Sequence, residues 1–84
     1  MITVMIIEDD LMVREINSKF LRKVDGFKLS KTTDSISEAM KYTLETPPDL
    51  ILLDIYLPQS NGLEFLRWLR KEKIGCDVIL LIFR

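Results

Sequence analysis

Apolar and polar positions along this chain follow two alternating periods. Three mostly apolar runs, at residues 2–7 (ITVMII), 50–54 (LILLD) and 77–83 (DVILLIF), are short and rich in Ile, Leu and Val. Continuous runs of this length predict strands that are buried on both faces, as in a parallel sheet. Residues 27–32 (FKLSKT) alternate between apolar and polar instead, which is typical of a half-buried or edge strand.

Between these strands the apolar spacing changes to three or four residues, which predicts amphipathic helices. The first helix is predicted over residues 11–24, with Gly26 as its stop signal. Its buried stripe is predicted to consist of Val13, Ile16, Phe20 and Val24. Another helix is predicted over residues 63–72 (LEFLRWLRKE), with Phe65 in the core.

The helix between these two is predicted from its boundaries as well as its spacing. Ser35 followed by Glu38 forms a capping-box pattern at its start, and Pro47 and Pro48 end it. Its apolar face is predicted to consist of Ile36, Ala39, Met40 and Leu44. The resulting order is β-α-β-α-β-α-β, which predicts a single α/β domain with parallel strands and right-handed crossovers.

The charge balance and the missing histidine exclude several classes of function. The 84 residues include 12 Lys and Arg, 13 Asp and Glu, and no His. A near-neutral chain does not suggest a basic nucleic-acid-binding arm, and without histidine there is no histidine triad or histidine metal ligand. The single cysteine, Cys76, lies beside an apolar run and is predicted to be a buried, reduced thiol. With no charged leader and no apolar run near the ~20 residues of a membrane span, we expect a cytoplasmic protein without membrane contact.

Acidic residues follow two of the predicted strands. Glu8, Asp9 and Asp10 come after the first strand, and Asp54 ends the strand at residues 50–54. Either group alone is explained by polar loops and by the helix dipole. If the two strands are neighbours, however, Asp9 and Asp54 converge at the carboxyl edge of the sheet, where ligands bind in open parallel sheets. Close carboxylates repel one another unless a cation lies among them, and Mg²⁺ prefers such oxygen ligands, so the pattern suggests a Mg²⁺ site with phosphate chemistry.

These motifs resemble the receiver domains of two-component response regulators. The resemblance rests on IIEDD at residues 6–10, LILLDIYLP at residues 50–58, and the Asn-Gly pair at residues 61–62. It covers essentially the whole chain and implies a flavodoxin-like, doubly wound parallel sheet. The segments MVREIN and GLEFLRWLR further resemble the branch that senses citrate and dicarboxylates.

The resemblance also implies roles for particular residues. Asp54 would be the phosphoacceptor, taking a phosphoryl group from a histidine on a sensor kinase. Mg²⁺ would be held by Asp9 directly, by Glu8 mostly through water, by Asp54, and by the backbone carbonyl of Tyr56. Asp10 is expected to cap the first helix. The expected role is therefore that of a signalling domain rather than an enzyme, in a family that controls transcription.

The chain departs from the family pattern near its end. A Ser or Thr normally ends the fourth strand, but Ile82, Phe83 and Arg84 carry no hydroxyl. Arg84 could imitate a phosphate contact. The family's lysine, fifth strand and last two helices are also absent, so residues 1–84 are expected to form an incomplete receiver domain. Because no helix-turn-helix region follows, we expect no direct nucleic-acid binding by this chain.

Three other functions fit the sequence less well, and the sequence also predicts one further property. A truncated, non-switching interaction or decoy module, or an inactive fragment, is the main alternative, since the hydroxyl and the lysine are missing. An aspartate-nucleophile phosphatase is disfavoured because Tyr56 stands where that class has a second acid. A nucleotide-binding fold is disfavoured because no glycine-rich loop follows the first strand. The unprotected strand at residues 77–83 predicts self-association.

Overall fold

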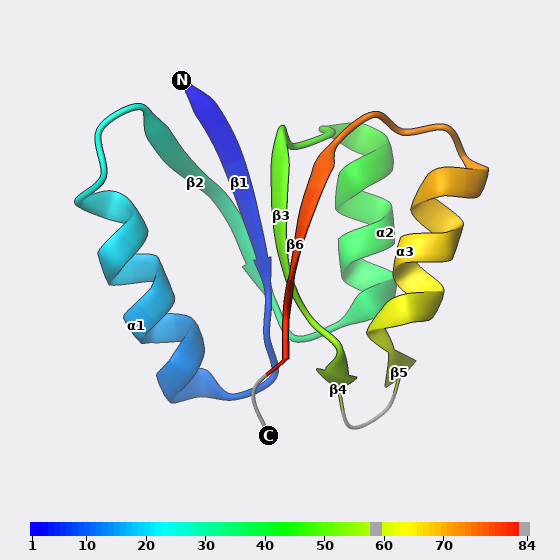
Figure 1. Ribbon diagram of the computed structural model, residues 1–84, viewed down its shortest axis with the longest axis horizontal. Helices are drawn as coiled ribbons and strands as arrows, with labels where there is room; N and C mark the ends of the chain where they lie inside the picture. The colour runs from blue at the N-terminus through cyan, green and yellow to red at the C-terminus, as the bar shows by residue number, and fades with distance from the viewer. Residues whose placement is uncertain (58–59, 83–84) are drawn as a thin grey trace.

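The chain forms a parallel sheet with helices on both faces. The computed structural model describes residues 1–57 and 60–82. A four-stranded sheet has the order β2-β1-β3-β6, with bounds β1 (Ile2–Ile7), β2 (Phe27–Thr33), β3 (Leu50–Asp54) and β6 (Asp77–Leu81). The helices are α1 (Leu11–Arg22), α2 (Ile36–Glu45) and α3 (Gly62–Lys71). Helix α1 covers one face of the sheet, whereas α2 and α3 lie on the other (Figure 1). The predicted α/β fold is confirmed, and β2 is an edge strand as its alternating pattern indicates.

The main core lies between the sheet and helices α2 and α3. Successive side chains of a strand point to opposite faces, and Met5, Ile7, Ile51 and Leu53 all point to this side. Helix α3 contributes Phe65 and Leu69, and α2 contributes Ala39 to the same cluster. Phe65 is fully buried, as predicted. Cys76 is also in this core and 3% exposed, which confirms the predicted buried thiol.

Polar side chains begin all three helices. The Asp10 carboxylate accepts hydrogen bonds from the backbone N–H groups of Met12 and Val13 at 2.9 and 3.1 Å, which confirms its predicted role as a cap. Ser35 likewise accepts from the N–H of Glu38 at 3.2 Å. The Glu38 carboxylate pairs with Lys31 at 2.6 Å, and this neighbouring ammonium lowers the pKa of Glu38.

Some element boundaries differ from the predictions by one or two residues. Helix α1 ends at Arg22 rather than at residue 24, and Gly26 follows in a left-handed conformation with φ of +90°. Helix α2 ends before Pro47, as predicted. Strand β6 ends at Leu81, so the predicted strand was too long at Ile82; Phe83, its last predicted residue, lies outside the described residues, as do Pro58 and Arg84.

The predicted burial of the α1 stripe is wrong. Phe20 is 67% exposed, and Ile16 and Val24 are about half exposed at 46% and 48%. The buried residue of the helix is Ser18, whose hydroxyl donates to the carbonyl of Arg14 at 2.7 Å. Leu44 of α2, predicted on the apolar face, is likewise 60% exposed.

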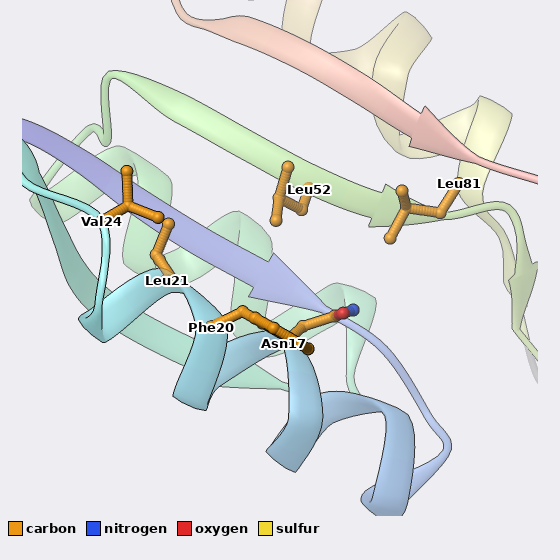
Figure 2. Close-up of a pocket in the computed structure, with 6 residues that line it drawn as sticks. All are labelled: Asn17, Phe20, Leu21, Val24, Leu52 and Leu81. Atoms are coloured by element: carbon orange, nitrogen blue, oxygen red, sulfur yellow. The ribbon is translucent and has the colours of Figure 1, made fainter.

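The physical reason for the exposed α1 stripe is the position of the helix on its face. Helix α1 packs against β1 and β2, so in the described part of the chain no helix covers β3 and β6 on this side. Figure 2 shows the resulting apolar groove, in which Phe20 of α1 and Val24, just after the helix, line one side and Leu52 of β3 and Leu81 of β6 line the other. The apolar stripe of α1 therefore borders a groove rather than a covered core.

Within residues 1–57 and 60–82, no helix is both long and apolar enough to cross a bilayer.

Candidate functional site

Three carboxylates meet at the carboxyl edge of the sheet. Strands β1 and β3 are parallel neighbours, and Ile7 is in register with Leu53. Glu8 and Asp9 therefore leave β1 at the level where Asp54 ends β3. A carboxylate oxygen from each of Glu8, Asp9 and Asp54 lies within 4.8 Å of the others. The predicted convergence of Asp9 and Asp54 is confirmed, and Glu8 joins them.

These carboxylates are held at the boundary between the core and solvent. Glu8 is 4% exposed and Asp54 is 6% exposed, while Asp9 is partly exposed. The backbone N–H of Asp10 donates to the Glu8 carboxylate at 3.2 Å. The guanidinium of Arg14 donates to the Glu8 backbone carbonyl at 3.0 Å, which ties α1 to the end of β1. The site is thus positioned by backbone and side-chain contacts from two elements.

Burial and crowding raise the pKa of Glu8 to about 7. The largest cause is desolvation, because removal from water disfavours the charged form of a carboxyl group. The hydrogen bond to Asp54 adds to the shift, and the backbone N–H of Asp10 opposes it. A cation bound among these carboxylates would relieve the repulsion between them.

The loop after β3 is more ordered than the sequence predicts. β4 (Tyr56–Leu57) and β5 (Ser60–Asn61) form a short antiparallel pair between β3 and α3. The N–H of Tyr56 donates to Asp54 Oδ1 at 2.9 Å and so restrains the orientation of the carboxylate. The Tyr56 side chain is 42% exposed. The assignment of its backbone carbonyl to a metal shell stays a prediction.

Gly62 is required by a close backbone approach at the start of α3. A Cβ atom there would lie 2.8 Å from the Cα of Ile55 and 3.0 Å from the carbonyl oxygen of Asp54. Any side chain would push α3 away from the end of β3. Asn61 caps the same helix by accepting from the N–H of Leu63 at 2.8 Å. The Asn-Gly pair therefore places α3 against the acidic edge of the sheet. The sequence identifies this pair as a motif, but its structural role is visible only in the fold.

The neighbouring strand brings apolar residues to this edge. Leu81 is in register with Asp54, and Ile82 follows it with 60% of its surface exposed. Neither residue carries a hydroxyl or an amine that could contact a phosphoryl group. The other two candidate positions, Phe83 and Arg84, lie outside the described residues.

The donor set fits a small divalent cation. Mg²⁺ binds carboxylate oxygens and usually retains several waters. Three carboxylates within 4.8 Å, partly buried and mutually repelling, match that preference. The cluster could therefore hold a metal ion.

A pH titration of stability should reveal the proton that Glu8 retains in the folded chain. The pKa of Glu8 is about 7 in the folded chain and 4.5 for an unperturbed glutamate. Between these values the folded chain keeps a proton that the unfolded chain has lost. Unfolding therefore releases a proton, so the stability contributed by Glu8 is complete below pH 4.5 and is lost by about pH 7.

Glu8→Gln should remove this dependence because an amide mimics the neutral carboxyl group. The measurement is the urea-unfolding free energy of both proteins from pH 4 to 8 with EDTA present. The variant should become more stable relative to the parent as the pH rises through this window. Parallel curves for the two proteins would show that Glu8 keeps its ordinary pKa.

Fold and site together define an α/β domain with an acidic cluster at the carboxyl edge of its parallel sheet. The chain belongs to the response regulator receiver domain family, whose model matches residues 4–82. These domains are signalling domains rather than enzymes in the usual sense.

Among curated relatives, the chain is 46% identical over 79 residues to the probable C4-dicarboxylate response regulator DctR of Halalkalibacterium halodurans. It is 47% identical over 81 residues to the transcriptional regulatory protein MalR of Bacillus subtilis. These matches cover 94% and 96% of this chain but only 34% of each relative. The chain thus spans about a third of the length of these relatives, and the DctR match agrees with the resemblance to the dicarboxylate-sensing branch.

Solved structures agree with this membership. The MaeR response regulator bound to beryllium trifluoride matches with a TM-score of 0.89 and 38% identity, over 96% of this chain and 66% of that chain. The complex of histidine kinase ThkA with response regulator TrrA matches with a TM-score of 0.82 and 29% identity, over 95% of this chain and 67% of that chain. The second of these structures is a complex of a response regulator protein with a histidine kinase.

Proposed function

We propose that this chain is the phosphoacceptor module of a two-component response regulator, and that Asp54 accepts the phosphoryl group. The observation that carries the proposal is the convergence of three carboxylates at one sheet edge, with oxygens within 4.8 Å of one another. Membership of the receiver family supports it. So does MaeR, because beryllium trifluoride has the shape and charge of a phosphoryl group and that protein binds it.

The residues of the chain suit the transfer step. One oxygen of Asp54 attacks the phosphorus of a phosphohistidine, so that an O–P bond forms while the N–P bond breaks. The imidazole departs with the electron pair of that bond and takes up a proton. The Tyr56 N–H, 2.9 Å from Asp54 Oδ1, orients the carboxylate for this attack.

Glu8, Asp9, Asp54 and the backbone carbonyl of Tyr56 would hold Mg²⁺. When bound, this ion would neutralise charge on the phosphoryl oxygens. The raised pKa of Glu8 supports the assignment, because burial and, to a lesser degree, the neighbouring Asp54 disfavour its charged form, and a bound cation would offset that cost.

The partner in this proposal is a sensor histidine kinase in the cytoplasm. The ThkA–TrrA complex supports a kinase partner, and the DctR match supports a C4-dicarboxylate signal. The MalR match supports transcription control by the response regulator as a whole. In the described part of the chain, no element resembles a DNA-binding region, so these residues are proposed to receive the signal.

A matched pair of variants tests the metal assignment. Asp9→Asn removes a proposed ligand, whereas Asp10→Asn makes the same charge change one residue away and keeps a good helix cap. Mg²⁺ should raise the thermal midpoint of the parent and of Asp10→Asn, because a ligand that binds only the folded state stabilises it. Asp9→Asn should show little rise.

The same proteins can be tested for function. With a small phosphodonor, the parent and Asp10→Asn should gain one phosphoryl group in Mg²⁺ and none in EDTA, as read by intact mass. Asp9→Asn should take up the phosphoryl group at least about tenfold more slowly than the parent. A tenfold slower rate corresponds to a loss of about 1.4 kcal/mol of transition-state stabilisation. Equal behaviour of the two variants would remove Asp9 from the site, and no gain by the folded parent would overturn the proposed function.

A further inference from the structure

The proposed metal ligand Asp9 lies in the short connection between β1 and α1, and both of its neighbouring peptide groups are held by hydrogen bonds. The peptide before it is held through the Glu8 carbonyl oxygen, which accepts from the guanidinium of Arg14 at 3.0 Å. The peptide after it is held through the Asp10 N–H, which donates to the Glu8 carboxylate at 3.2 Å. Because peptide groups are planar, φ and ψ of Asp9 are its only soft backbone dihedrals. The two hydrogen bonds therefore restrain the direction in which the Asp9 side chain leaves the backbone.

These two hydrogen bonds differ in whether they compete with a metal ion. The acceptor for the Asp10 N–H is the Glu8 carboxylate, which is itself proposed to help hold the metal. The bond from Arg14 ends on a backbone carbonyl outside the proposed ligand set, so it is compatible with a bound cation. Glu8 is also tied to the sheet, because its N–H donates to the carbonyl of Thr33 at 2.9 Å. Arg14 thus connects α1 to a peptide that is already anchored on β1 and β2.

Helix α1 directs Arg14 toward this peptide. Arg14 is the fourth residue of the helix, and helical side chains lean toward the N-terminus. The N–H of Arg14 donates to the carbonyl of Asp10 at 2.9 Å, and its carbonyl accepts from the hydroxyl of Ser18 at 2.7 Å. With the backbone of this turn fixed and the side chain half-buried, the guanidinium reaches back over the helix start to the end of β1.

A cation at this place opposes the local electrostatics of the helix. The N-terminal end of a helix carries partial positive charge, which favours acidic residues and disfavours cations. The first turn of α1, Leu-Met-Val-Arg at residues 11–14, nevertheless ends in a cation. A residue that goes against the local preference and makes a specific contact is typical of a functional site.

Arg14 contacts the backbone rather than compensating the charge of the acidic cluster. The pKa of Glu8 is raised to about 7, first by burial and then by the hydrogen bond to Asp54. A guanidinium that acted strongly on this carboxylate would lower its pKa instead. The contact therefore affects where the acidic side chains lie more than how they titrate.

We propose that Arg14 is a positioning residue of the phosphoacceptor site, which holds the peptide between Glu8 and Asp9 so that the Asp9 carboxylate faces the acidic cluster. This inference rests on the proposed function, because only there is Asp9 a metal ligand. Groups that orient a metal ligand without touching the metal typically change metal affinity by about ten- to a hundredfold when they are mutated. Arg14 thereby controls how tightly the site holds its cation.

The first test compares Arg14→Gln with Arg22→Gln. Both changes remove one positive charge from α1, but Arg22 is exposed in the last turn, about two turns further along the helix. The measurement is the dissociation constant for Mn²⁺, which suits the same oxygen ligands as Mg²⁺, read from the electron paramagnetic resonance signal of the free ion. Arg14→Gln should bind Mn²⁺ about tenfold more weakly than the parent, whereas Arg22→Gln should bind it as the parent does.

The direction of the change separates positioning from other roles of Arg14. If the guanidinium acted only through its charge, its removal would leave the site more negative, and Mn²⁺ would bind more tightly. If it only held the fold together, Arg14→Gln would lose unfolding free energy in EDTA, yet the folded protein would keep the parent's affinity. Either result, or equal weakening by Arg22→Gln, would overturn the role of Arg14 alone. A folded parent that does not bind Mn²⁺ would refute the proposed metal site and this inference with it.

Arg14→Lys provides a second variant that keeps the charge and a good helix former, so the test does not depend on whether Arg14→Gln folds. Lysine is shorter and carries a single ammonium in place of the planar fork of donors. Arg14→Lys should therefore bind Mn²⁺ severalfold more weakly than the parent. Affinity equal to the parent's would show that the contact with the Glu8 carbonyl does not matter, contrary to the proposal.

A double-mutant cycle tests whether Arg14 acts through Asp9. In Asp9→Asn there is no Asp9 carboxylate to orient, so adding Arg14→Gln should change the residual Mn²⁺ affinity by less than about twofold, compared with about tenfold in the parent. An equal tenfold loss in both backgrounds would mean that Arg14 acts independently of Asp9, and the proposal would be wrong.

Discussion

Asp54→Asn is expected to abolish phosphoryl uptake: its rate should fall below about one hundredth of the parent's rate. That fall corresponds to a loss of about 2.7 kcal/mol or more of transition-state stabilisation. An amide oxygen lacks the charge that makes the carboxylate a nucleophile, and the amide would not form a stable acyl phosphate. Asn has nearly the same shape as Asp, so the 6% exposed position should remain well packed. The measurement is intact mass over time with a small phosphodonor and Mg²⁺.

Loss of fold can be separated from loss of chemistry in this variant. Asp54 is one of the groups that raise the pKa of Glu8, so its neutralisation should relieve repulsion within the cluster. The metal-free variant should therefore be at least as stable as the parent at neutral pH. A folded Asp54→Asn protein that still gained one phosphoryl group at the parent's rate would rule out Asp54 as the acceptor.

Phe65→Ala is expected to be the most destabilising single change, by about 3–5 kcal/mol. Phe65 is the largest of the fully buried side chains among the described residues, and its ring stacks on that of Trp68 with the ring centroids 5.7 Å apart. Removal of the ring leaves a cavity between α3 and the sheet. Small domains have little stability in reserve, so much of the population should unfold.

Leu63→Ala is the matched control for this change. Leu63 lies on the same helix but is 38% exposed, so its truncation should cost less than about 1 kcal/mol. Urea unfolding followed by circular dichroism measures both. If Phe65→Ala were no more destabilising than Leu63→Ala, the core around Phe65 would not be what holds α3 to the sheet.

The acidic site could be predicted because it depends on strand ends rather than on details of packing. Continuous apolar runs identify β1 and β3 as interior strands, and parallel neighbours bring their carboxyl ends together. Once Ile7 is in register with Leu53, residues Glu8 and Asp54 must lie close. The role of Asp10 could be predicted because it depends on the local sequence alone. Asp10 caps α1 by accepting hydrogen bonds from residues only two and three positions further along the chain.

Features that depend on contacts between distant elements could not be predicted. The amphipathic pattern of α1 is real, but no pattern within α1 reveals whether another element covers β3 and β6 beside it. Phe20 is consequently 67% exposed although its spacing predicts burial. The Asn-Gly pair is visible in the sequence as a family motif, whereas the reason for Gly62 is a 2.8 Å approach to Ile55 that appears only in three dimensions.

The most direct test of the central claim is to find the atom that carries the phosphoryl group. The protein is incubated with phosphodonor and Mg²⁺, reduced with borohydride, which converts an aspartyl phosphate to homoserine, and sequenced by tandem mass spectrometry. We predict homoserine at position 54 and intact carboxylates at Glu8, Asp9 and Asp10. Homoserine at another position, or none in protein that is folded and contains Mg²⁺, would contradict the account of Asp54 as the phosphoacceptor.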